Sequence, residues 1–229
     1  MNASAPDPNG APLAGPHLIR DQRLRWETTF ATNPTMYGLA PSESGSFALD
    51  RFSEENFTHV LELGAGQGRD TLALLRHGFE VSALDYAAEA LEEIVTAAGS
   101  QLTQRLRTTT HDVREPLPFP EQTFDACYSH MLFTMALSTG ELVDLVSEIH
   151  RVVRPGGLCI YTVRHTGDAH FGAGISLGDN LYENGGFVVH FFDRSLVQEL
   201  STGFEIEDVT EFDEGALPRR LWRVTLRRL

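Results

Sequence analysis

An apolar run that ends in three alternating glycines is the stretch of this sequence that most restricts its fold. Residues 60–63 (VLEL) precede residues 64–68 (GAGQG), and leucines at 72, 74 and 75 give the next segment an apolar face with helical spacing. Glycines at 64 and 66 permit a sharp turn and the close approach of a ligand, and the helix that follows offers free N–H groups. The pattern predicts a strand, a ligand-binding turn and a helix.

Strand-like and helix-like segments alternate beyond this turn. We expect strands at residues 58–63, 80–84, 105–110, 124–129 and 157–163, and helices at residues 67–77, 87–98 and 140–153. Such alternation gives right-handed crossovers and a mainly parallel sheet covered on both faces. Residues 204–212 and 221–229 have no helix between them and predict a hairpin. The predicted fold is α/β: a Rossmann-like doubly wound sheet of seven strands, mostly parallel with a C-terminal antiparallel hairpin.

The charged residues exclude several kinds of partner and reaction. The chain of 229 residues has 32 acidic and 18 basic residues, and its formal net charge is −14. A field of this sign repels phosphate backbones and anionic lipids, so we expect neither a nucleic-acid nor a membrane partner. Because all 18 basic residues are arginine, the chain has no lysine for a Schiff base, a P-loop or a general base.

The two cysteines and the histidines predict no metal site. Cys127 and Cys159 lie in separate apolar segments without metal-ligand spacing, which indicates inert thiols in a reducing compartment. No recognised zinc spacing occurs among the histidines and aspartates at positions 165, 168, 170, 179 and 190.

No apolar run approaches the roughly 20 residues that a membrane helix needs. We therefore expect a cytoplasmic protein.

Two further acidic residues follow predicted strands. Asp85 ends the strand after the glycine turn, at a spacing that suits a carboxylate accepting both hydroxyls of a ribose. Asp112 closes the next predicted strand, where it is placed to accept from an adenine amino group beside the Val113 amide. The carboxyl ends of neighbouring parallel strands meet at one edge of a sheet, so we expect one crevice that binds a nucleoside.

These motifs together resemble the class I S-adenosylmethionine-dependent methyltransferases. The matching segments are residues 62–68 (ELGAGQG), 84–85 (LD), 111–113 (HDV), 124–127 (FDAC) and 154–157 (RPGG). The resemblance implies that the cofactor is S-adenosylmethionine, whose cationic sulfonium suits an acidic cleft. It also implies which residues contact the cofactor: Glu62, Gly64, Ala65, Gly66, Gly68, Asp85, Tyr86, Asp112, Val113 and Ser129.

The acceptor of the methyl group is expected to be a small molecule. Residues 26–42 and 185–206 loosely resemble the outer segments of small-molecule and tellurite-resistance-type methyltransferases, whose first helices cap the cofactor and acceptor. A soft nucleophile such as a thiol or metalloid needs little machinery, whereas a protonated nitrogen or oxygen needs a base. The predicted acceptor contacts are Trp26, Tyr37, His130, Arg164 and Tyr182. His130 is also the candidate base; a hydrogen-bonded loop histidine is the alternative.

These features divide the chain into three parts. Residues 1–15 read as a disordered leader, residues 16–56 as an N-terminal helical cap, and residues 57–229 as the methyltransferase domain. Residues 164–189 are glycine-rich and irregular, which is typical of a lid-like insert. Two alternative functions stay open: a non-catalytic S-adenosylmethionine-binding regulatory or partner subunit, and a dinucleotide-dependent oxidoreductase, against which the glycine spacing and the missing lysine speak.

Overall fold

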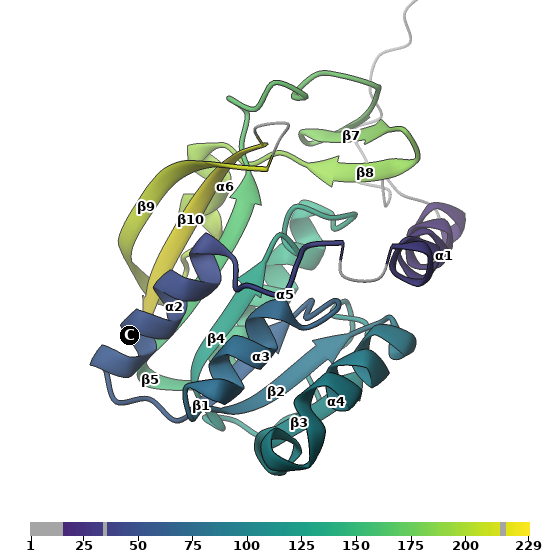
Figure 1. Ribbon diagram of the computed structural model, residues 1–229. Helices are drawn as coiled ribbons and strands as arrows, with labels where there is room; N and C mark the ends of the chain where they lie inside the picture. Colours follow the sequence, from purple (N-terminus) through teal and green to yellow (C-terminus); the bar gives the residue numbers. More distant parts are fainter. Residues whose placement is uncertain (1–15, 34–35, 216–218) are drawn as a thin grey trace, which may run out of the picture.

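A computed structural model describes residues 16–33, 36–215 and 219–229 (Figure 1). The predicted leader, residues 1–15, lies outside them. The α-helices are α1 (Pro16–Thr32), α2 (Glu43–Glu54), α3 (Arg69–Arg76), α4 (Ala88–Leu102), α5 (Thr139–Val152) and α6 (Arg194–Leu200), with a 3₁₀ turn at Thr103–Arg105. The strands are β1 (His59–Leu63), β2 (Glu80–Asp85), β3 (Leu106–Thr110), β4 (Phe124–His130), β5 (Val153–Arg164), β6 (Ile175–Gly178), β7 (Leu181–Asn184), β8 (Phe187–His190), β9 (Phe204–Glu214) and β10 (Arg219–Arg228).

Seven strands form the main sheet, in the order β3-β2-β1-β4-β5-β10-β9. Strands β1 to β5 pair in parallel, and β10 lies antiparallel between β5 and β9. The predicted fold class is therefore confirmed. Because β1 is flanked by β2 on one side and by β4 on the other, the strand order reverses there. Ligands of open α/β sheets bind at such a switch point.

Helices cover both faces of this sheet, as the predicted crossovers require. Side chains alternate along each strand, so Val60 of β1 packs with α2, α3 and α4, while its neighbour Leu61 packs with α5 and α6. Figure 1 shows α2–α4 on the near side of the sheet. The two apolar layers hold the strands rigidly and leave their carboxyl ends free to carry a site.

The predicted irregular insert contains a second sheet. Strands β6, β7 and β8 pair antiparallel, and both connections are two-residue turns with positive φ: Asp179 and Asn180 (46° and 58°), then Gly185 and Gly186 (61° and 88°). Turns of this kind match the twist of a hairpin, and asparagine and glycine adopt them readily. Leu181 and Val188 pack together under the sheet.

The two helices of the predicted cap lie in different surroundings. Helix α2 belongs to the core, where the Phe52 side chain is fully buried. Helix α1 instead lies beside β8 (Figure 1). There Gln22 donates to the Gly186 carbonyl (2.7 Å) and accepts from the Val188 amide (3.3 Å). The boundary at residue 56 stays a prediction. None of the described helices is long and apolar enough to cross a bilayer.

Candidate active site

A cavity of about 700 Å³ opens at the carboxyl ends of β1, β2, β4 and β5. One end is formed by residues near the glycine turn, and we call it the glycine-turn end: Glu62, residues 64–68, Asp85, Tyr86, Asp112 and Val113. The other, which we call the aromatic end, is formed by Trp26, Tyr37, Tyr182, Phe187 and Phe191, with His130, Glu214 and Arg219, whereas Phe30 lies against Gly66. All but one of the predicted site residues thus line the same cavity.

The glycine turn has left-handed backbone at Gly64, Gly66 and Gly68, with φ of 73°, 51° and 82°. The Gly66 amide donates to Oδ2 of Asp85 (2.8 Å), and the Ala87 amide donates to Oδ1 (2.9 Å). The Asp85 carboxylate therefore holds the turn against the end of β2. Each of its oxygens keeps a lone pair for a further donor.

Packing also accounts for two of the three glycines. A Cβ at Gly64 would lie 2.9 Å from Cβ of Leu132, and a Cβ at Gly68 would lie 2.5 Å from Cγ1 of Ile94. Both distances are shorter than carbon atoms tolerate. Packing is thus a second reason for glycine at position 64, and the contact of Gly64 with a ligand stays a prediction.

Of the two carboxyl groups at the glycine-turn end, Glu62 is buried and Asp85 is partly buried. Glu62 is 3% exposed and accepts a hydrogen bond from the Thr71 hydroxyl (2.6 Å). Burial, reinforced by the nearby charge of Asp70, raises the pKa of Glu62 to about 8. Burial also raises the pKa of Asp85, although backbone amides donate to it. No arginine forms an ion pair with either carboxyl among the described residues.

The predicted adenine contacts lie together at the ends of β2 and β3. Tyr86 lines the cavity, and burial raises the pKa of its hydroxyl. Asp112 accepts two hydrogen bonds from Nη1 of Arg114 (both 2.9 Å), and Nη2 of Arg114 donates to the Ala136 carbonyl (2.8 Å). Arg114 was not predicted as a site residue. It orients Asp112 and joins it to the segment that follows β4.

Ser129 is the predicted cofactor contact that the structure does not bring to the cavity. Its side chain is fully buried, and its hydroxyl donates to the Leu63 carbonyl (3.0 Å). Strand β4 extends one residue beyond its predicted end, to His130. Because side chains alternate along a strand, His130 points to the cavity and Ser129 does not.

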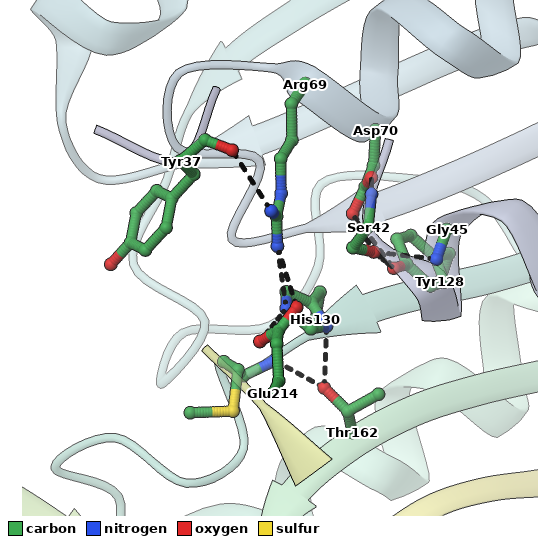
Figure 2. Close-up of polar contacts among 10 residues, drawn as sticks. Tyr37, Ser42, Gly45, Arg69, Asp70, Tyr128, His130, Thr162 and Glu214 are labelled. Atoms are coloured by element: carbon green, nitrogen blue, oxygen red, sulfur yellow. Dashed lines mark hydrogen bonds and ion pairs between the residues drawn. The ribbon is translucent and has the colours of Figure 1, made fainter. Parts of the chain in front are cut away.

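Figure 2 shows His130 held by partners on both ring nitrogens. Its Nε2 lies 3.1 Å from Nη2 of Arg69 and 3.2 Å from Oε2 of Glu214, and its Nδ1 lies 2.9 Å from Oγ1 of Thr162. Arg69 also contacts Glu214 directly (3.2 Å). Burial would raise the pKa of Glu214, but the hydrogen bond from His130 and the charges of His130 and Arg69 lower it to about 2. Glu214 is therefore a fixed anion.

A second polar network in Figure 2 fixes the start of α2. Asp70 accepts hydrogen bonds from the Ser42 amide (2.7 Å), the Ser42 hydroxyl (2.8 Å) and the Tyr128 hydroxyl (3.0 Å). The Ser42 hydroxyl in turn caps α2 by accepting from the Gly45 amide (2.7 Å). Arg69 and Asp70, which directly follow the glycine turn, thus anchor two separate parts of the chain.

The outer wall of the aromatic end is built by α1 and the insert. Trp26 packs on Phe187 with ring centroids 5.2 Å apart, and Tyr182 lines the same wall. Arg164 lines the cavity too, but its Nη2 lies 2.5 Å from Oδ1 of Asp168. An internal, almost fully buried ion pair thus occupies the charge of Arg164, and its role as an acceptor contact stays a prediction.

The structure gives the insert histidines ordinary packing partners. His165 stacks on Trp222 (centroids 4.5 Å apart), and His190 lies 2.8 Å from the Leu137 carbonyl. Burial lowers the pKa of both imidazoles. Among the described residues, no group of three or more histidine, cysteine or acidic side chains is arranged to hold a metal ion.

A family model described as a methyltransferase domain matches residues 60–157, which include the glycine turn, Asp85, Asp112 and β4. These residues supply most of the parallel part of a sheet that has the seven strands and the antiparallel hairpin expected above. Residues 60–157 therefore belong to a class I S-adenosylmethionine-dependent methyltransferase domain. The predicted family is confirmed for this domain, and S-adenosylmethionine is the cofactor of that family.

Curated relatives of the methyltransferase domain match it over part of their length. A malonyl-[acyl-carrier protein] O-methyltransferase of Salmonella typhimurium is 31% identical over 124 residues, which are 52% of this chain and 44% of that relative. The chain spans less than half the length of the first curated relatives that it matches.

Solved structures match nearly the whole chain. The 1,6-didemethyltoxoflavin-N1-methyltransferase of Burkholderia thailandensis, solved with 1,6-didemethyltoxoflavin and S-adenosylhomocysteine, has a TM-score of 0.71 and 21% identity, over 96% of this chain and 93% of that one. The [4+2]-cyclase SpnF has a TM-score of 0.69 and 16% identity, over 95% and 99%. At such identities the likeness shows the fold alone, and a transferase and a cyclase share it.

Proposed function

We propose that this chain transfers a methyl group from S-adenosylmethionine to a small-molecule acceptor. The observation that carries the proposal is one cavity of about 700 Å³ that joins the glycine-turn end to the aromatic end. Small-molecule sites typically measure about 300–1,000 Å³. One space thus offers a polar end for the methyl donor and an apolar end for an acceptor.

The glycine-turn end has the chemistry to hold the donor. Asp85 keeps free lone pairs for the ribose hydroxyls, and Tyr86 offers an aromatic face to the adenine. At the edge of the adenine ring, Asp112 offers a carboxylate and Val113 a backbone amide. When bound, S-adenosylmethionine supplies a methyl group on a sulfonium, which a nucleophile takes by direct displacement. The carboxyl groups of Glu62 and Asp85 favour a cationic ligand, because a nearby positive charge offsets the cost of burying their ionised forms.

The aromatic end supports positioning and the exclusion of water. Trp26 and Tyr182 bring ring surface to a wall that α1 and the insert close together. Holding two reactants at a fixed distance and orientation supplies a large part of the rate of a displacement. A small acceptor suits this enclosed wall better than a polymer does.

The hydrogen bonds of His130 favour a role in orienting the acceptor. Glu214 and Arg69 engage one ring nitrogen and Thr162 the other, so neither nitrogen is free to remove a proton. We therefore expect an acceptor whose attacking atom already carries an available lone pair, such as a thiolate, a metalloid anion, an amine or an ionised oxygen.

Calorimetric titration of the purified full chain with S-adenosylhomocysteine, and separately with NAD⁺, tests the first half of the proposal. We expect S-adenosylhomocysteine to bind and NAD⁺ not to bind. Absence of S-adenosylhomocysteine binding would refute the proposal, and binding of NAD⁺ alone would favour the oxidoreductase.

A screen of thiols, metalloid anions, amines and phenols with methyl-labelled cofactor tests the second half. We expect labelled product from at least one class, and we expect His130→Ala to lower turnover while cofactor affinity is kept. Equal loss of turnover and cofactor affinity in that variant would indicate a structural role. Cofactor binding without transfer to any acceptor class would favour the non-catalytic subunit.

A further inference from the structure

Five arginines line the cavity, and four of them have an acidic partner. The pairs are Arg23 with Glu27 (2.8 Å), Arg69 with Glu214 (3.2 Å), Arg114 with Asp112 (2.9 Å) and Arg164 with Asp168 (2.5 Å). The fifth is Arg219. Among the residues whose side chains the structure describes, no carboxylate oxygen lies within 4.0 Å of its guanidinium. In a chain with a net charge of −14, an arginine without such a partner in a cavity is unusual.

Arg219 is the first residue of β10 and lies at the aromatic end. Its partner across the hairpin is Glu214, but Arg69 and His130 already contact that carboxylate, each at 3.2 Å. Burial raises the pKa of the Tyr37 hydroxyl, and Arg219 is the strongest of the nearby charges that oppose this rise. Arg219 and Tyr37 both line this cavity.

Flat apolar surface lines the same end of the cavity. The rings of Trp26, Tyr182 and Phe187 are each only partly buried, and all three line the cavity. Aromatic faces of this kind favour planar, unsaturated ligands by offset stacking or edge contacts. A ligand here meets apolar rings over its body and, at one point, an arginine that has no carboxylate partner among the described side chains.

We propose that the aromatic end takes a planar, unsaturated acceptor that carries a carboxylate, with Arg219 as the charged contact and Tyr37 as a hydrogen-bond donor beside it. The inference rests on the proposed function, because it names the chemical class of that acceptor. A guanidinium fork matches the two oxygens of a carboxylate, and hydrogen bonds between charged groups are stronger than neutral ones. Arg219 thus determines specificity and does not take part in the displacement.

Two matched probes test this inference: 2-naphthoate and 2-naphthamide, which have the same planar body and differ in charge. Binding of each to the full chain saturated with S-adenosylhomocysteine is measured by calorimetry or by ligand-observed NMR. We expect naphthoate to bind at least about tenfold more tightly, because a charge-assisted pair is stronger than a neutral hydrogen bond. Arg219→Gln should abolish this difference, and added salt should reduce it in the wild type.

Arg220→Gln is the matched control, because Arg220 is the next residue of β10, does not line the cavity, and lies 4.0 Å from Asp213 on the outside. We expect this variant to keep the preference for naphthoate. Equal affinity of the wild type for both probes, failure to bind naphthoate, or equal losses in the two variants would overturn the inference. The S-adenosylhomocysteine titration separates the outcomes: if it binds while the preference is absent, only the inference fails.

Discussion

The two ends of the cavity differ in how the chain builds them. The glycine-turn end comes from residues 62–113, a single stretch in which each group follows a strand of one sheet. The aromatic end joins α1, the end of β4, the insert and the tip of the β9–β10 hairpin, and its contacts connect residues up to 166 positions apart. One end is thus fixed by local backbone geometry and the other by long-range contacts.

The two ends of the cavity also differ in the charged groups that they carry. At the glycine-turn end, Glu62 and Asp85 are a buried and a partly buried acid whose hydrogen-bond donors are a hydroxyl and backbone amides. At the aromatic end, Arg69 and Arg164 are paired with acids that are themselves partly or fully buried. The first end favours a cation, whereas at the second end the described arginines have acidic partners, Arg219 apart. This difference predicts distinct consequences for substitutions at the two ends.

Gly68→Ala should have the largest effect, because it combines left-handed backbone with a Cβ that would meet Ile94 at 2.5 Å. The backbone cost is about 1–2 kcal/mol and overpacking adds about 1–3 kcal/mol. Gly172 in the insert is the matched control, since its φ is 80° and nothing lies within 4 Å of a Cβ there. Denaturant unfolding of both alanine variants measures the difference. Equal losses would contradict the idea that packing, more than backbone strain, demands glycine at position 68.

Glu62→Gln should change how stability depends on pH. The pKa of Glu62 is raised from 4.5 to about 8, so the folded state holds a proton that the unfolded state releases between these values. The free energy of unfolding therefore falls as pH rises from about 4.5 to 8, by about 1.4 kcal/mol for each pH unit from this group. The variant should lack this loss, so its stability relative to the wild type should increase over that window.

Unfolding in urea at several pH values between 5 and 8 measures the slope for both proteins. Glu92→Gln, which changes an exposed glutamate on α4, is the control and should follow the wild-type slope. Parallel curves for the wild type and Glu62→Gln would mean that Glu62 is ionised in the folded protein. The glycine-turn end would then lack the buried neutral acid that distinguishes it.

Asp85→Ala should weaken cofactor binding tenfold or more, because a carboxylate that accepts from two ribose hydroxyls contributes about 1.5–3 kcal/mol. The variant also removes the acceptor of the Gly66 amide, so the turn itself loses support. Titration with S-adenosylhomocysteine measures the effect, and Asp50→Ala, at an exposed position of α2, serves as the control. Affinity close to that of the wild type would refute the assignment of Asp85 to the ribose.

The difference between the ends also explains what could be predicted from sequence. The glycine turn, Asp85 and Asp112 were predictable because strand, turn and helix follow one another within a few residues. Ser129 was expected at the cavity, but it lies within β4, where alternation along the strand turns its side chain into the core and that of His130 to the cavity. No helical or strand periodicity in the sequence predicts the pairing of Arg164 with Asp168, four residues later.

The aromatic end was predictable only in part. Asp179-Asn180 and Gly185-Gly186 are two-residue hairpin signals inside the insert, and reading them would have indicated its small sheet. The contact between Arg69 and Glu214 gave no such signal, because 145 residues separate the two. No local rule brings a residue after a glycine turn to the tip of a distant hairpin.

Gln22→Ala tests the aromatic end by itself and should have the smallest effect. Gln22 is 6% exposed and bridges α1 to the β7–β8 hairpin through Gly186 and Val188. Its loss removes two hydrogen bonds of about 1 kcal/mol each at most, so the global free energy of unfolding should change little. Hydrogen exchange should quicken at the Val188 amide and leave the amides of β2 unchanged, because only the contact between α1 and the insert opens.

Arg23→Ala, which breaks an exposed ion pair on the same helix, should alter neither region. Faster exchange in β2 as well would mean that the two ends open as one unit, and the contrast between a locally built end and a long-range one would not extend to their stability.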